Sequence, residues 1–425
     1  MANNFDSNFT RKLMRSFLDS FESQRVLTKN VNTQLFQGKF NPSTGDTIDV
    51  KRPTDYVSVR TPTGDLTAET KSDIITGKAS AVVQNYFTTF VDFDEADEAI
   101  KMDQLDELLA PMATRMKTDF ELDYAKFMKN NAGLLSGTYG SPALVWDDIA
   151  AYGSIMDATG VPRDSKWNVA VNPFTQTNLA SNQRSLGSGG TSGGLISEAH
   201  REAILSDNFA GMKVMSANTL ASNTIAAGAD RAGTVTSLDV TYVTAKDTMT
   251  QSIVVAAFTN DLVIKAGEVV QITGRNRLNL STREEILDGT GAVILFTGTV
   301  TTDVTLSATG TGTIVITGPA IFESAGQYNT TSTAVAAADV ITLLGAAADI
   351  IQPNLFWHKD AFTVASVPIK RLKATDSIAT TEDGLQFRVT RDSDFTKNEN
   401  LVRIDFRPAY GVLNPFFAGQ GFGTP

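Results

Sequence analysis

Cysteine is absent from this chain of 425 residues. Without thiols the chain has no disulfide, no thiolate metal ligand and no cysteine nucleophile, which fits a reducing compartment or simple avoidance of oxidation. Histidine is almost absent as well, since only His200 and His358 occur. Two imidazoles leave little material for histidine-based metal binding or acid–base catalysis. These two shortages argue against most metalloenzymes and thiol enzymes.

Long apolar runs and excess positive charge are also missing. No stretch approaches the ~18 apolar residues of a membrane helix, and the N-terminal MANNFDSNF lacks the apolar centre of a signal peptide. We therefore expect a soluble protein that binds no membrane and is not exported by that route. The 36 Lys and Arg residues against 47 Asp and Glu give a net charge of −11. That charge argues against tight, non-specific binding of nucleic acid, which needs cations to neutralise phosphates.

The residues that are present are those of a globular protein. The composition is 42% hydrophobic and 20% charged, which is typical of folded domains. A chain of this length exceeds one ordinary hydrophobic core, so we expect two or three domains.

One long helix is predicted from Met102 to Asn130. Its apolar residues recur in steps of three and four, which places them on one face of a helix. Pro111 lacks an N–H and would kink the helix or begin its second part, and the Asn130–Gly133 stretch would end it. The acidic run Asp92–Glu98 before it lacks the glycine of a calcium loop, so we interpret it as compensation of the helix dipole.

An amphipathic arm is predicted at residues 1–32. Its apolar anchors recur every four residues, at Phe5, Phe9, Leu13, Phe17 and Phe21. Two interpretations stay open, packing on the arm's own subunit and docking into a groove of a partner. Adsorption to a membrane is disfavoured, because Asp19 and Glu22 dilute the basic face.

Residues 33–80 are predicted to form an extended, two-stranded loop. Turn chemistry recurs at Asn41–Asp46 and Thr61–Asp65, and few large apolar residues lie between. Because an isolated hairpin is marginal in water, we expect support from outside its own subunit, although a flexible surface loop is the alternative. The candidate inter-subunit contacts are the basic residues Lys51, Arg52, Arg60, Lys71 and Lys78. A single strand is predicted to follow at 81–93.

The rest of the chain is predicted as an α/β body with an inserted β domain. Between 134 and 221 the pattern predicts helices at Trp146–Thr159 and Pro173–Gln183 and a buried strand at Trp167–Val171. Residues 222–351 turn to Thr, Val, Ala and Gly, and evenly spaced short strands there predict a small barrel or sandwich. The predicted strands are 234–243, 252–259, 268–273, 292–306, 312–317 and 339–344. Residues 352–425 return to mixed character, with paired strands at 384–390 and 401–406.

No constellation of residues predicts an enzyme, a metal site or a cofactor site. Gly190–Gly194 formally matches G-x-S-x-G, but a nucleophile elbow needs a buried strand before it, and none is predicted. Phosphate-loop, dinucleotide and HExxH patterns are absent. His200 and His358 are interpreted as hydrogen-bonded structural residues. The cluster Lys370, Arg371 and Lys373 is too short for a nucleic-acid footprint.

The order of these elements resembles the major capsid (coat) proteins of tailed double-stranded DNA bacteriophages, in particular the short-tailed type with a β-barrel insertion domain. The similarity covers nearly the whole chain. It rests on the following residues, in this order: Ser43–Asp46, Val50–Pro53, Arg60–Asp65, Ile75–Ala79, Glu98–Lys101, Gln104–Pro111, Pro353–Phe356, Tyr410, Asn414 and Pro415.

The resemblance implies an α+β class, the Johnson fold. In its terms the domains are an N-terminal arm at 1–32, an extended loop at 33–80, a peripheral domain with the spine helix at 81–133, an axial domain at 134–221, an inserted β-barrel at 222–351 and a return to both domains at 352–425.

The resemblance also implies a function. The subunits would form pentamers and hexamers of an icosahedral shell, assembled in the bacterial cytoplasm on a scaffolding protein and joined by a portal protein. The shell of the virion would then enclose double-stranded DNA without sequence-specific binding. Two alternatives stay open, a decoration or tail component built on β domains, and a cytosolic serine hydrolase using Ser192.

Overall fold

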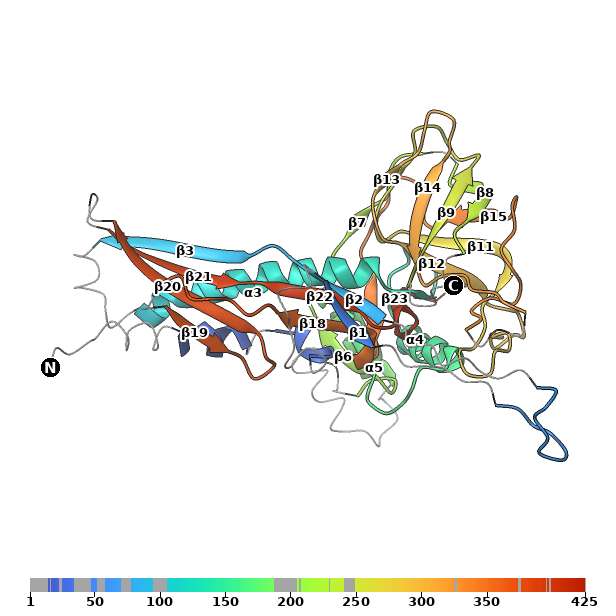
Figure 1. Ribbon diagram of the computed structural model, residues 1–425, viewed down its shortest axis with the longest axis horizontal. Coiled ribbons are helices and arrows are strands. Elements are labelled where there is room, and N and C mark those ends of the chain that lie inside the picture. Colours follow the sequence, from blue (N-terminus) through green and yellow to red (C-terminus); the bar gives the residue numbers. More distant parts are fainter. Residues whose placement is uncertain are drawn as a thin grey trace. The chain divides into compact units, whose positions relative to one another are not determined.

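A computed structural model describes residues 14–15, 17–22, 25–33, 47–51, 58–69, 78–94, 105–186, 205, 208–228, 230–240, 249–324, 326, 328–373, 376–394, 396 and 399–424 (Figure 1). The chain divides into two compact units. The first unit comprises Met1–Ile48, Ser80–Ala125 and Phe362–Gly411, and the second comprises Asp49–Ala79, Lys126–Ala361 and Val412–Pro425.

The long helix is confirmed as α3, Leu105–Asn130, with Pro111 inside it. Residues 102–104 lie outside the described part of the chain. The predicted apolar face is buried at Met112, Met116, Phe120, Tyr124 and Met128. Two polar side chains of the predicted outer face, Lys117 and Glu121, are buried too, and so is Lys129 near the end of the helix. The helix is therefore covered on more of its circumference than an amphipathic pattern predicts.

Two four-stranded sheets lie largely in the first unit, although most of β1 and the start of β2 belong to the second. One has the order β1-β2-β22-β18 and the other the order β19-β20-β21-β3. Their strands are β1 (Thr47–Lys51), β2 (Lys78–Val83), β3 (Phe87–Asp94), β18 (Phe362–Ser366), β19 (Ser377–Thr380), β20 (Gln386–Asp394), β21 (Glu399–Phe406) and β22 (Pro408–Val412). The predicted pairing of 384–390 with 401–406 is confirmed by the antiparallel register of β20 and β21.

The prediction of one strand at 81–93 is wrong, because the chain changes sheets at Gln84–Tyr86. β2 pairs with β22 and β3 pairs with β21. The partner strands break at the same level, where Arg407 separates β21 from β22. Pro408 accepts a hydrogen bond from the Gln84 N–H at 2.9 Å, and the Arg407 guanidinium lies 5.1 Å from the centre of the Tyr86 ring. These contacts between residues more than 300 positions apart hold the bend.

Phenylalanine rings form the core of the first unit, where α3 runs along the sheet of β3, β20 and β21 (Figure 1). Phe87, Phe406 and Phe387 lie directly opposite one another on adjacent strands. Phe120 of α3 packs edge-on against Phe406, with ring centres 5.0 Å apart. Offset and edge-to-face contacts of this kind add to the free energy gained by burying the rings.

A five-stranded sheet forms the body of the second unit, with the order β4-β23-β17-β5-β6. Its strands are β4 (Leu134–Ser136), β5 (Asn168–Val171), β6 (Lys213–Ser216), β17 (Asn354–Trp357) and β23 (Ala418–Gly421), and its helices are α4 (Trp146–Thr159) and α5 (Pro173–Leu186). All of the predicted elements between 146 and 183 are confirmed. The C-terminal β23 pairs antiparallel with β17 and parallel with β4, so the last residues complete this sheet.

The predicted β domain contains a closed six-stranded barrel of order β11-β12-β14-β9-β8-β15. Its strands are β8 (Ala232–Leu238), β9 (Thr250–Ala256), β11 (Val269–Asn276), β12 (Leu295–Val300), β14 (Gly312–Thr317) and β15 (Val340–Leu343). Every barrel strand overlaps one of the six predicted strands. Closure removes open sheet edges, and it is made here by pairing β15 with β8 and β11.

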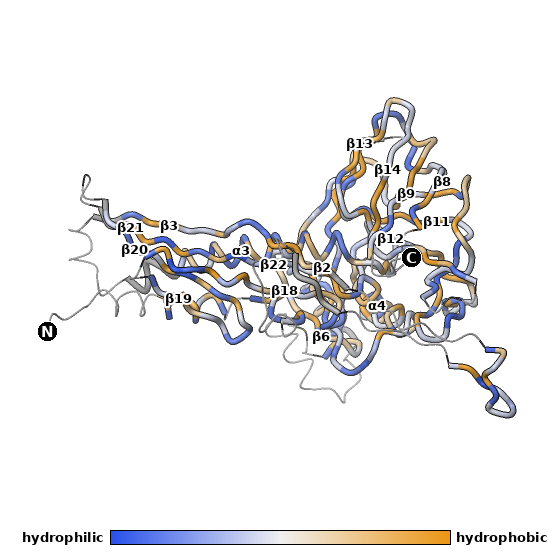
Figure 2. Tube along the Cα trace, viewed as in Figure 1, coloured by the Kyte–Doolittle hydropathy of each residue, from blue (hydrophilic) through white to orange (hydrophobic). Residues whose placement is uncertain are grey.

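The barrel has its own apolar core. Figure 2 shows apolar colouring along β9 and β11, and inward residues such as Ile253, Val255, Ile272 and Phe296 are fully buried. The remaining short elements are β7 (Asn223–Thr224), β10 (Val263–Ile264), β13 (Val304–Thr305), β16 (Ile350–Ile351), η1 (Thr28–Asn30), η6 (Lys359–Ala361) and η7 (Pro415–Phe417). β7 pairs with β16, and these strands flank the barrel in the sequence.

Candidate assembly elements

The described part of the N-terminal arm packs on its own unit. Phe17 and Phe21 are buried, and their rings contact Phe387 at centre distances of 5.5 and 4.8 Å. Phe5, Phe9 and Leu13, the other candidate arm contacts, lie outside the described residues.

Glu121 of α3 fixes the chain after the arm. It is fully buried and accepts hydrogen bonds from the Leu27 N–H at 2.8 Å, the Thr28 N–H at 3.1 Å and the Thr28 hydroxyl. A buried carboxylate is stable only when such donors surround it. The helix spacing put Glu121 on the outer face, so the sequence pattern did not reveal this role.

The described part of the extended loop is a turn without buried side chains. Residues 58–69 are all exposed or half-buried, and Arg60 is exposed. The Asp65 carboxylate accepts from the Thr67 N–H at 2.9 Å and from its hydroxyl, and these bonds hold the pKa of Asp65 below its usual value. Lys51 lies in β1 and Lys78 lies in β2, and for both lysines only the backbone is described. Arg52 and Lys71 lie outside the described residues.

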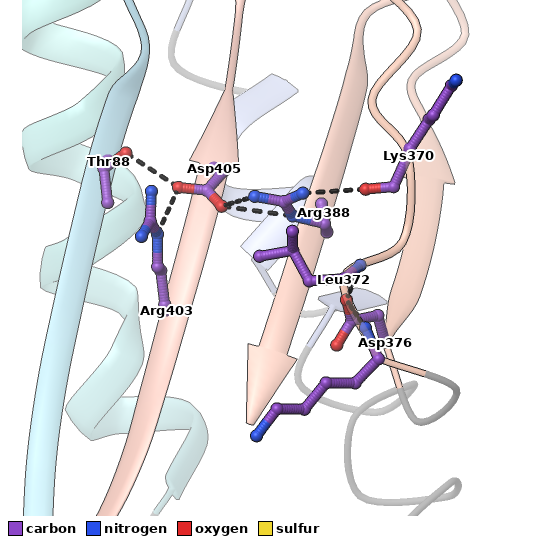
Figure 3. Close-up of polar contacts among 8 residues, drawn as sticks. Thr88, Lys370, Leu372, Asp376, Arg388, Arg403 and Asp405 are labelled. Carbon is purple, nitrogen blue, oxygen red and sulfur yellow. Dashed lines mark hydrogen bonds and ion pairs between the residues drawn. The ribbon is translucent and has the colours of Figure 1, made fainter. Parts of the chain in front are cut away.

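A buried ionic cluster lies on the outer face of the sheet β19-β20-β21-β3, the face opposite the phenylalanine core. Figure 3 shows Asp405 of β21 between Arg388, Arg403 and Thr88. Asp405 forms ion pairs with Arg388 and with Arg403, the latter at 2.7 Å, and it accepts from the Thr88 hydroxyl at 2.8 Å. Arg388 also donates to the Lys370 carbonyl at 2.8 Å.

The environment of Asp405 favours its charged form. Asp405 is 0% exposed and Arg388 is 6% exposed. Burial alone would raise the pKa of Asp405, but the hydrogen bonds from Arg388, Arg403 and Thr88 outweigh it and lower the pKa below 3.8. The cluster therefore joins three strands through one ionised carboxylate. Arg388 and Asp405 come to lie together only through strand register, which the sequence did not show.

Arg277 joins the barrel to the end of α3 within the second unit. Its Nη2 donates to the Gly133 carbonyl at 3.2 Å and to the Thr297 carbonyl and hydroxyl at 2.6 and 2.9 Å. Its guanidinium also lies 5.4 Å from the Phe296 ring centre and 5.8 Å from that of Phe416. Burial lowers the pKa of Arg277 to about 10. It remains charged at neutral pH, where it suits the negative end of the helix dipole.

Other donors complete this junction at the carbonyls that end α3. The Thr299 hydroxyl of β12 donates to the Ala132 carbonyl at 2.5 Å. The Gln420 side chain donates to the carbonyls of Lys129 and Gly267, at 3.1 and 2.9 Å. The last carbonyls of a helix have no partner within the helix. Donors from the barrel and from β23 therefore supply these partners.

Lys129 lies in the same junction and is 5% exposed. Its Nζ lies 3.5 Å from the Ser222 carbonyl. Burial lowers the pKa of Lys129 to about 8, opposed by Asp303 and Glu268 and assisted by Lys126. At neutral pH the ammonium is charged, so its burial opposes folding.

We expect the stability conferred by Lys129 to rise with pH. Between about 8 and ~10.4, the unfolded value, the unfolded chain binds more protons at this site, so the free energy of unfolding rises by up to about 3 kcal/mol. A Lys129→Met variant should lack this rise. Denaturant titrations of both proteins at pH 7 and pH 10 measure the difference, with Lys126→Met, at an exposed position, as the control. Parallel curves for Lys129→Met and the unaltered chain would contradict the assignment.

Among the residues that the structure describes, one cluster contains possible metal ligands, namely Asp164, His358 and Asp360, whose ligand atoms lie within 4.8 Å of one another. The His358 Nδ1 accepts the Asp360 N–H at 3.1 Å, so the ring proton resides on Nε2. Nε2 lies 2.7 Å from Asp164 and 3.0 Å from Ser165. A protonated Nε2 cannot ligate a cation. His358 is thus a buried, hydrogen-bonded histidine, as predicted, while His200 and the Gly190–Gly194 motif lie outside the described residues.

The family profile of the P22 coat protein, gene protein 5, matches residues 1–423 of this chain. The chain belongs to the P22 coat protein family. The major capsid protein of Acyrthosiphon pisum secondary endosymbiont phage 1 is 33% identical over 429 residues, which cover 100% of both sequences. Solved structures show weaker similarity. The structure from Mycobacterium phage Che8 is 13% identical, with 93% of this chain and 90% of that chain covered and a TM-score of 0.45. The capsid of Ralstonia phage GP4 is 7% identical, with 93% of this chain and 88% of that chain covered and a TM-score of 0.42.

Membership of the P22 coat protein family confirms the coat-protein prediction. The chain is a major capsid protein that forms the icosahedral shell of the phage virion, and it is structural and not enzymatic. Its fold is the α+β capsid fold with a closed six-stranded barrel. The family match decides against the decoration, tail and hydrolase alternatives. No helix in the described ranges is long and apolar enough to cross a membrane.

Proposed function

We propose that this coat protein assembles as pentamers and hexamers on a scaffolding protein, in a shell that also includes a portal protein. The extended loop is the observation that supports this proposal most directly. Its described residues, 58–69, bury no side chain, yet the turn is fixed by Asp65. A preformed turn without support from its own subunit is suited to rest on a neighbouring copy. The candidate contacts of this loop remain Lys51, Arg52, Arg60, Lys71 and Lys78.

The arm is proposed to contact the scaffold or to shift when the shell expands. Because Phe17 and Phe21 are buried against the first unit, this role falls to Phe5, Phe9 and Leu13. The genome is proposed to fill the shell without sequence-specific binding. The net charge of −11 supports that part, since an acidic wall does not retain DNA by neutralising phosphates.

Electron microscopy of the purified protein, with and without its scaffolding protein, tests the proposal. We expect closed shells of uniform size with the scaffold, and reconstruction should resolve five- and six-fold capsomers. Monodisperse monomer under both conditions would count against self-assembly on a scaffold. Shells built from another kind of capsomer would contradict the pentamer and hexamer arrangement.

Reversing the charge of Arg60 should lower the yield of shells and leave the subunit folded. Arg60 is exposed in its own subunit, so Arg60→Glu removes no hydrogen bond or ion pair with the described residues but places a like charge against the acidic surface of a neighbour. Shell yield by sedimentation and folding by circular dichroism are the measurements. Arg60→Lys keeps the charge and should assemble normally. Normal shells from Arg60→Glu would exclude an ionic role for this residue.

A further inference from the structure

The sheet β19-β20-β21-β3 has two open edges. In the described part of the chain β3 pairs only with β21, and β19 pairs only with β20. β3 is eight residues long and contains no proline or lysine. Phe90, near its middle, is 73% exposed. A long edge strand without such protection is a template for a strand from another chain.

The directions of the strands allow the two edges to pair with each other between copies. Each strand of the sheet is antiparallel to its neighbour, so β3 and β19 run in opposite directions. When β3 of one copy lies beside β19 of the next, the antiparallel ladder continues across the contact. The same contact can then repeat from copy to copy. A head-to-tail contact of this kind closes rings when the rotation per subunit is suitable.

Charge favours the same arrangement. β3 ends with Asp92 and Asp94. β19 follows the exposed cations Lys370 and Arg371, whereas the nearby Lys373 is already paired with Asp392 of its own subunit. Antiparallel pairing places the C-terminal end of β3 beside the N-terminal side of β19, so this acidic end of β3 approaches the segment that carries Lys370 and Arg371. Pairing of β3 with β3 of a second copy would bring no cation to these acids.

We propose that β3 of one coat subunit adds to the outer edge of β19 in the next, with Phe90 opposite Ile378. The proposal rests on the self-assembly proposed above and gives it a specific contact. Both side chains point to the outer face of the sheet. Phe90 lies opposite Arg403, and Arg403 lies opposite Thr390. Arg388, two residues before Thr390 on the same strand, points to the same face and lies opposite Ile378. An apolar cross-strand pair then covers the exposed Phe90.

The absence of cysteine makes a direct test possible. Opposite residues in antiparallel strands have Cα atoms ~4.5–5.5 Å apart, within the range that a disulfide spans. Shells of a Phe90→Cys, Ile378→Cys variant, oxidised after assembly, should give a ladder of covalent oligomers on non-reducing gels. A Phe90→Cys, Thr380→Cys variant tests the diagonal neighbour. Each single variant, and Phe90→Cys combined with Thr290→Cys on an exposed barrel turn, should remain monomeric.

The outcomes separate this contact from self-assembly itself. Dimers from Phe90→Cys alone would show that β3 pairs with β3, and closed shells without any covalent ladder would overturn the contact while self-assembly stands. Absence of shells from the unaltered chain with its scaffold would overturn both. A ladder in the Phe90→Cys, Ile378→Cys shells, absent from the control pair, is the expected result.

Discussion

Replacing Arg277 with methionine should lower the free energy of unfolding by about 3 kcal/mol. The side chain is 2% exposed, and its Nη2 donates hydrogen bonds to the Gly133 carbonyl and to two oxygens of Thr297. Methionine fills a similar volume but donates no hydrogen bond, so buried acceptors in both the barrel and the end of α3 lose their partner. Each unsatisfied acceptor costs roughly 1–3 kcal/mol.

One effect opposes this loss. Burial lowers the pKa of Arg277 to about 10, so the charged guanidinium is less stable here than in water. Methionine removes that penalty, and replacing buried ions by apolar residues is neutral or stabilising in some proteins. Here charged hydrogen bonds worth roughly 1.5–3 kcal/mol each and the contacts with Phe296 and Phe416 are lost together. We expect the loss to exceed the relief.

Thermal or denaturant unfolding of the soluble subunit measures the effect of Arg277→Met. Limited proteolysis should also cut faster between β7 and β8 or between β15 and β16, because the barrel retains its own core when its junction is weakened. Arg163→Met is the control, since it removes an exposed ion pair with Asp157 and should change stability by less than about 1 kcal/mol. Equal stability of the two variants would show that the junction does not depend on Arg277.

The elements predicted correctly are those whose signal is local. Apolar spacing of three and four indicated α3, and alternation with regular turns indicated all six barrel strands. Short-range patterns could not indicate how the barrel closes, because β8 pairs with β15 about a hundred residues later. The break at Gln84–Tyr86 was missed for the same reason, since its cause is Arg407 and Pro408 at the other end of the chain.

The sequence patterns mainly failed to predict which charged residues are buried. Glu121, Lys129, Arg277 and Asp405 are each within 5% of full burial, although polarity placed the residues of α3 at the surface. A buried ion is tolerated only where several distant donors or acceptors converge on it. Thr28 for Glu121 and Gly133 for Arg277 lie 93 and 144 positions away. Only the folded chain brings such partners together.

Asp405→Asn should have the second large effect, a loss of about 4 kcal/mol in the free energy of unfolding at neutral pH. The substitution removes the negative charge that forms an ion pair with Arg388 (Figure 3), and Arg388 is itself 6% exposed. A buried cation without its anion is what makes the loss large. The asparagine keeps the size of the side chain, so packing of β20 against β21 is preserved and the loss reports on charge.

The effect of Asp405→Asn should depend on pH in a defined direction. Hydrogen bonds hold the folded pKa of Asp405 below 3.8, its value without such contacts. Stability from the ionised carboxylate is therefore fully present above the unfolded pKa and is lost as pH falls through the lower, folded pKa. The difference between the unaltered chain and the variant should stay constant from neutral pH to about 5 and shrink below about 4.

Asp392→Asn is the control, because it removes an exposed ion pair where Asp405→Asn removes a buried one. Asp392 lies on the same sheet and pairs with Lys373 at 2.5 Å, but both side chains are about half exposed, so the loss of stability should be much smaller than that of Asp405→Asn. Denaturant titrations at pH 7, 5 and 3 compare the two variants with the unaltered chain. If Asp405→Asn destabilises no more than Asp392→Asn, burial does not strengthen this pair. A large loss that persists unchanged at pH 3 would instead point to packing, because below the unfolded pKa part of the stability from the ionised carboxylate is lost.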